Sequence, residues 1–339
     1  MQRFEAWWAR PWLEELGAPR TCAPLECETV GIVLANPRPT ANCEVSARRA
    51  WDAPRLLKLW HLASLDAPTV AVVWAWAFGR ALQVSLPAWA LGLLALIVWA
   101  IYVGDRLLDA LGGLRDPTRH PLQERHYFHW RNRRVLAPLA AVAAIAATWI
   151  VHQRLPGLAI RQDSVVAVAA VAYFSGVHSR SSLPRWVQRA AARLFSREFA
   201  VGAIFSAGCS LPVLSTLRTQ GHLANWPRLL VLALFFALLA WLNVRAISDW
   251  EDSPSPAPAQ RVGWLAVAIG AMGLSAAVLL AASGSEGVAA VLAAGGLSAG
   301  LLALLNRLRP TLTSLTLRIG ADFVLLTPLL LAAVWPAGR

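Results

Sequence analysis

Charged residues are scarce in this chain, and acidic ones are the scarcest. Of its 339 residues 15% are charged, only 19 are Asp or Glu, and 57% are hydrophobic. About a quarter of the residues of a typical soluble domain are charged, so this composition excludes an ordinary soluble protein. Apolar runs recur along most of the chain, and each is long enough to cross a bilayer core of about 30 Å as a helix. The composition therefore predicts an all-α, polytopic membrane bundle.

The few cysteines do not predict disulfides or a zinc site, and no signal peptide is predicted. The N-terminal segment holds Cys22, Cys27 and Cys43, while Cys209 lies in an apolar run. We expect that segment to be cytoplasmic, so no disulfide framework is predicted, and the C-x4-C-x15-C spacing is a poor zinc pattern. The first residues are charged throughout and form no apolar signal core. Residues 1–56 are interpreted as a cytoplasmic segment, partly disordered or lying on the membrane surface, and 57–339 as the transmembrane domain.

Nine apolar runs are predicted to span the membrane, the fourth being interrupted by polar residues. They are Ala67–Leu86, Ala88–Val103, Val135–Val151, Leu158–Val177, Phe199–Leu214, Leu229–Val244, Val262–Ala282, Val288–Leu305 and Ile319–Trp335.

The net charge of +12 is explained by membrane topology. The arginines lie in short loops between apolar runs and form no continuous face, so nucleic acid is not an expected partner. Most of them fall in the N-terminal segment and in alternate loops. The positive-inside rule then predicts a cytoplasmic N-terminus and a C-terminus on the opposite side, in an inner or cytoplasmic membrane. Membrane lipids are expected partners of the basic residues.

Two expected cytoplasmic loops hold acidic residues, and chemistry is expected there. Asp105 and Asp109, here called the first acidic motif, are four residues apart at the end of the second apolar run. If the helix continues, both project from one face. Such a pair suits magnesium, which takes one or two carboxylates together with substrate phosphate oxygens.

The second loop follows the sixth apolar run and contains Asp249, Glu251 and Asp252, here called the second acidic motif. Asp249 and Asp252 are three residues apart and share one face of a helical turn. Both motifs lie on the same predicted side of the membrane. They could therefore flank one cavity mouth.

These features resemble the UbiA superfamily of intramembrane prenyltransferases, whose members have nine helices and two Asp-rich motifs in these same loops. Asp105-Arg106-Leu107-Leu108-Asp109 gives D-R-x-x-D, and Arg115, Arg119, Pro121 and Leu122 follow it as in the family's R-x-x-R-P-L type segment. The sequence departs from the family in three places. Ile101 stands at the usual Asn position, His120 is inserted before the Pro-Leu pair, and the second motif is D-x-E-D where D-x3-D is common.

The resemblance implies Mg²⁺-dependent transfer of a prenyl group from an isoprenyl diphosphate to a lipophilic, usually aromatic, acceptor. The metal would be held by Asp105, Asp109, Asp249, Glu251 and Asp252, the four aspartates being the catalytic set. The diphosphate would be bound by Arg106, Arg119, Arg197 and Arg245.

Two other functions stay open. The altered second motif is compatible with a catalytically weakened protein that binds an isoprenoid lipid, and polytopic bundles of this size include transporters. Asp322 is an ionisable group at membrane depth and hence a site candidate, although it could simply pair with Arg318. The basic run containing His120, His126 and His129 is interpreted as a positive-inside anchor in preference to a phosphate site.

Overall fold

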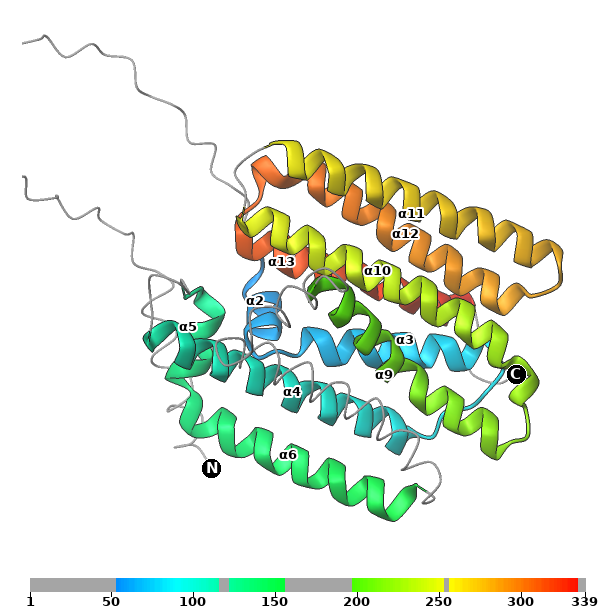
Figure 1. Ribbon diagram of the computed structural model, residues 1–339, viewed down its shortest axis with the longest axis horizontal. Helices are drawn as coiled ribbons and strands as arrows, with labels where there is room; N and C mark the ends of the chain where they lie inside the picture. Colours follow the sequence, from blue (N-terminus) through cyan, green and yellow to red (C-terminus); the bar gives the residue numbers. More distant parts are fainter. Residues whose placement is uncertain (1–52, 116–121, 156–196, 253–255, 335–339) are drawn as a thin grey trace, which may run out of the picture. The chain divides into compact units, whose positions relative to one another are not determined.

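The computed structural model describes residues 53–115, 122–155, 197–252 and 256–334, and every element within them is helical (Figure 1). The long helices are α3 (Asp66–Ala81), α4 (Ala88–Arg115), α6 (Arg133–Arg154), α9 (Arg197–Thr219), α10 (Trp226–Asp252), α11 (Pro256–Ala282) and α12 (Glu286–Leu308). The shorter α-helices are α2 (Arg55–Leu62), α5 (Glu124–Arg131), α13 (Ser314–Phe323) and α14 (Leu331–Val334). The described residues also form three 3₁₀ segments: η2 (Leu223–Asn225), η3 (Arg309–Thr311) and η4 (Val324–Leu330).

Seven helical segments of the described chain are long and apolar enough to cross a membrane, and the bent pair α2 and α3 raises this to eight. Their outer faces are apolar: Trp149 is 65%, Trp264 75% and Leu279 72% exposed. Such side chains would be costly in water and are at home against lipid. The protein is therefore a polytopic, integral membrane protein. The fourth predicted span, Leu158–Val177, lies outside the described residues.

The first and last predicted spans differ from continuous helices. α2 and α3 meet at 86°, and Ser64 between them has a φ of 56°, a left-handed conformation that a helix cannot continue through. Gln83, with a φ of 58°, ends α3 in the same way before Leu86 is reached. The last predicted span is divided into α13, η4 and α14, and Pro328 in η4 has no N–H to donate to an α-helical turn.

Close backbone approaches hold the bundle together. A Cβ atom added at Gly202 of α9 would lie 2.7 Å from the backbone nitrogen of Trp241 in α10, and one at Gly287 of α12 would lie 2.5 Å from the carbonyl oxygen of Ala81. Small residues at such contacts let helices pack where lipid supplies no hydrophobic drive. In the core, Trp74 stacks on Phe236 with ring centroids 4.1 Å apart.

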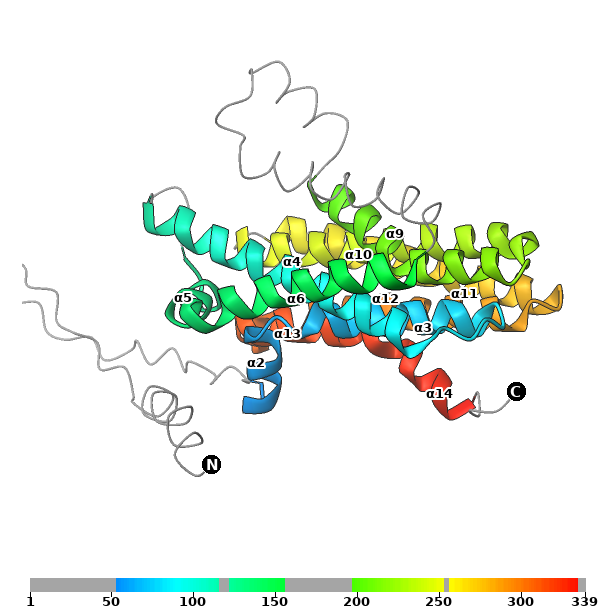
Figure 2. The same cartoon turned by 90° about the horizontal axis from the view of Figure 1, so that it is seen from below.

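Segments near the two ends of the described chain are joined by hydrogen bonds. The backbone N–H of Ala53 donates to Thr316 Oγ1 at 2.9 Å, and the indole N–H of Trp74 donates to the carbonyl of Leu325 at 2.9 Å. α2, α5 and α13 lie at one end of the helix bundle, the end at which α4 and α10 also finish (Figures 1 and 2). This end carries the acidic motifs.

Candidate functional site at the polar end of the bundle

The first acidic motif lies wholly within a helix. α4 runs on to Arg115, so Asp105 and Asp109 occupy neighbouring turns of one helix and share a face, as the spacing predicts. Asp109 Oδ2 lies 3.8 Å from Nε2 of His126 in α5. The helix α5 was not anticipated from the sequence, and it supplies most of the contacts described below.

The second acidic motif ends α10, which runs to Asp252. Asp249 is buried, and Oδ1 of its carboxylate accepts an ion-pair contact at 3.0 Å from Arg245, one turn earlier. The guanidinium that the sequence assigned to diphosphate is therefore turned toward its own helix. The side chains of Asp252 and Arg197, and all of Arg119, fall outside the described residues, so their roles stay predictions.

Glu251 connects three helices. Its carboxylate pairs with Arg318 of α13, and Oε1 lies 3.2 Å from Nη1 of Arg125 in α5. The amide of Gln123 donates to Oε2 at 3.1 Å. Glu251, which the sequence predicted as a metal ligand, thus accepts from three side chains. Arg318, which the sequence considered as a partner of Asp322, forms its ion pair with Glu251.

Three guanidinium groups converge at this end: Arg106 of α4, Arg125 of α5 and Arg318 of α13, here called the arginine cluster. The pKa of Arg125 is lowered by burial and by the other two arginines, while Glu251 and Asp109 raise it. Arg125 therefore interacts electrostatically with a carboxylate of each acidic motif. Arg106 also acts electrostatically on His61, Arg318 and His126, which places its positive charge at this end of the bundle.

Two histidines of α5 are held neutral. Burial, followed by the positive charge of Arg125, lowers the pKa of His126 to about 3, and burial lowers that of His129 to about 4. His129 donates from Nδ1 to the carbonyl of Arg125 at 2.8 Å, so Nε2 accepts from the Ser64 hydroxyl at 3.2 Å. His129 therefore joins α5 to the α2–α3 bend, while His126 faces Asp109 of α4.

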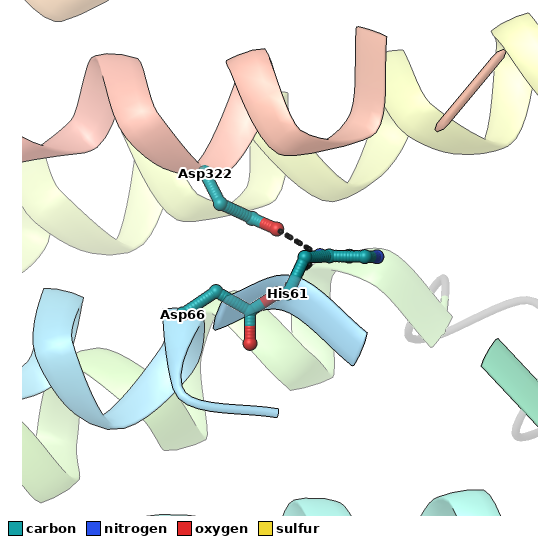
Figure 3. A group of neighbouring side chains, drawn as sticks. All are labelled: His61, Asp66 and Asp322. Atoms are coloured by element: carbon teal, nitrogen blue, oxygen red, sulfur yellow. Dashed lines mark hydrogen bonds and ion pairs between the residues drawn. The ribbon is translucent and has the colours of Figure 1, made fainter. Parts of the chain in front are cut away.

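A second group of ligand-bearing side chains lies beside this region (Figure 3). His61 of α2 lies 2.6 Å through Nδ1 from Asp66 Oδ2, at the start of α3, and 3.7 Å from Asp322 Oδ2, in α13. These residues are here called the His–Asp cluster. The sequence singled out Asp322. It gave no comparable signal for His61 or Asp66, because only the sharp bend between α2 and α3 brings them together.

The arrangement bears on which residues could hold a metal. Within the described part of the chain, the His–Asp cluster is the one group of three or more such side chains whose ligand atoms all lie close enough for one ion. The carboxylates of the acidic motifs do not form such a group there. These carboxylates are compatible with magnesium, because Mg²⁺ often takes only one or two carboxylates and binds substrate phosphate and water oxygens for the rest.

Arg125, Arg318 and His126 lie at this end, although the sequence did not assign them to the site. Arg125 and His126 belong to the basic run that was interpreted as a membrane anchor in preference to a phosphate site, and Arg318 was considered only as a partner of Asp322. No family model, curated protein or solved structure matches this chain.

Proposed function

We propose that this protein is a magnesium-dependent, UbiA-like prenyltransferase with nine membrane-spanning helices, which moves a prenyl group from an isoprenyl diphosphate to a lipophilic, aromatic acceptor. The observation that carries the proposal is the meeting of two acidic motifs and the arginine cluster at one end of an apolar bundle. An isoprenyl diphosphate matches this arrangement, because its polyanionic head suits the charged end and its apolar chain suits the helix bundle.

Each part of the site would have a defined task. Arg106, Arg125 and Arg318 would bind phosphate oxygens through charge-assisted hydrogen bonds, which are stronger than neutral ones. Asp105 and Asp109, with Asp249 across the site, would hold Mg²⁺, which neutralises the charge that develops on a diphosphate leaving group. Apolar helix faces would bury the tail, each CH₂ contributing about 0.8 kcal/mol, and would exclude water from the allylic cation. We also propose that the N-terminus and the site formed by the acidic motifs and the arginine cluster lie on the cytoplasmic side of the membrane.

The test is release of pyrophosphate by purified protein given geranylgeranyl or longer isoprenyl diphosphates and a panel of aromatic acceptors. We expect release that requires Mg²⁺ and falls at least 100-fold, the effect typical of lost charge stabilisation, in Asp105→Asn and Asp249→Asn. Glu286→Gln is the matched control, because Glu286 begins α12, away from both acidic motifs. Release that persists in both aspartate variants would refute the proposal.

A second candidate is an isoprenoid-lipid-binding protein without turnover. It is favoured by one observation: Asp249 and Glu251 already pair with Arg245, Arg125 and Arg318, which leaves less negative charge for a metal. Folded wild-type protein that binds an isoprenyl diphosphate but releases no pyrophosphate would select this candidate.

A further inference from the structure

The His–Asp cluster has the ligands and the burial of a metal site. His61 and Asp66 are only 4% and 5% exposed, and one ligand atom from each of His61, Asp66 and Asp322 lies within 4.8 Å of the others. A tetrahedral ion with bonds of about 2.0–2.1 Å holds its ligands about 3.3 Å apart. The 2.6 Å and 3.7 Å separations around His61 Nδ1 bracket that value.

The charges of the cluster favour a bound cation, because Arg318, the arginine that acts on both His61 and Asp322, is already paired with Glu251. Two carboxylates face one imidazole nitrogen, and like charges at such separations are not both ionised unless a positive charge joins them. The neutral donors around them are few: the backbone N–H of Ala67 donates to Asp66 at 2.9 Å, and the amide of Asn243 donates to Asp322 at 3.2 Å. A divalent ion would balance both carboxylates while leaving the imidazole neutral.

Asn243 supplies an independent observation. Its side chain comes from α10, is 4% exposed, and is aimed at Asp322, yet its Oδ1 has no hydrogen-bond partner among the described residues. A buried acceptor without a partner is costly. Rotating the amide by half a turn would bring Oδ1 to the cluster in place of the NH₂ group. Oδ1 would then be a fourth ligand and would gain a partner in the ion.

We propose that His61, Asp66 and Asp322 bind one divalent transition-metal ion of the zinc class, with Asn243 as the fourth, oxygen ligand. An imidazole nitrogen with carboxylate oxygens suits zinc and its neighbours in the first transition series better than magnesium, which prefers oxygen alone. The ion would join α2, α3, α10 and α13. This site is separate from the acidic motifs and does not depend on prenyl transfer.

The test is zinc retention by tag-free protein that has been stripped with a chelator and then reloaded with Zn²⁺ alone. We expect about one zinc per wild-type chain by elemental mass spectrometry after buffer exchange. His61→Gln, Asp66→Asn and Asp322→Asn are expected to lose it, while Asp105→Asn and Asp249→Asn keep it. Because no diphosphate or turnover is involved, the result is independent of the proposed function.

Two further measurements keep the test decisive where a variant does not fold. Wild-type protein loaded with Co²⁺ should show the visible absorption of a four-coordinate nitrogen and oxygen site, and Zn²⁺ should raise the apparent Tm of the wild type. Absence of retained zinc in the wild type would overturn the proposal. So would retention by all three cluster variants, or loss in Asp105→Asn, since each would assign the ion to other residues.

Discussion

Glu251 is the residue on which the polar end most depends, because it pairs with arginines from two other helices. Replacing it by Gln leaves Arg125 and Arg318 without that ion pair, so we expect a loss of about 1 kcal/mol, as for a partly exposed pair with more than one partner. Thermal unfolding in detergent measures the effect as a lower apparent Tm. Glu124→Gln is the matched control, an exposed site on α5 with the same change of charge. Equal shifts in the two variants would contradict a structural role for Glu251.

His126 and His129 make stability depend on pH. Their pKa values of about 3 and 4 lie below the ordinary 6.5, so the unfolded chain takes up protons first as the pH falls. Stability from this source is complete above pH 6.5 and is lost as the pH falls from 6.5 to about 4 for His129 and to about 3 for His126. Each histidine should cost about 1 kcal/mol by pH 5.5.

The check is the apparent Tm of wild-type protein and of a His126→Gln, His129→Gln double variant at pH 7.5 and 5.5. We expect the drop on acidification to be smaller in the double variant. An identical drop would show that other groups control the acid response.

Helices α9 and α10 approach each other closely at Gly202, which has no Cβ. Gly202→Ala places a carbon 2.7 Å from the nitrogen of Trp241 and 2.8 Å from the carbonyl oxygen of Ala237, both backbone atoms that cannot move aside alone. We expect a loss of about 1–3 kcal/mol, the range for overpacking, seen as a lower apparent Tm. Gly208→Ala on the same helix meets nothing within 4 Å. It should be neutral or stabilising, because Ala favours a helix; a loss as large as that of Gly202→Ala would refute the packing argument.

At this scale the sequence predicts some elements well and others poorly. Apolar runs of sufficient length identify α4, α6, α9, α10, α11 and α12, because only a helix satisfies its backbone in lipid. Spacing within the acidic motifs predicts shared helix faces, and α4 and α10 do continue through Asp109 and Asp252. α5 was missed because its eight residues are basic and aromatic, without an apolar run. The 86° bend at Ser64 depends on tertiary contacts that no local pattern encodes.

For the whole molecule, the nine-helix proposal has a consequence for topology. An odd number of spans puts the two termini on opposite sides. In a bacterial host we expect green fluorescent protein to fluoresce when fused at the N-terminus or after Asp252, and alkaline phosphatase to be active when fused after Arg339. A fluorescent fusion after Arg339 would mean an even number of spans and would contradict the proposal.

The hydrogen bond between Trp74 and Leu325 sets a condition on biosynthesis. Its two residues are separated by 251 positions, so at 5–20 residues per second the ribosome needs roughly 10–50 s to supply the second after the first. During that interval the indole N–H of Trp74, together with His61 and Asp66, lacks its partners from the last elements. The early helices must therefore wait in the membrane, or with an insertion factor, until the end of the chain has been made.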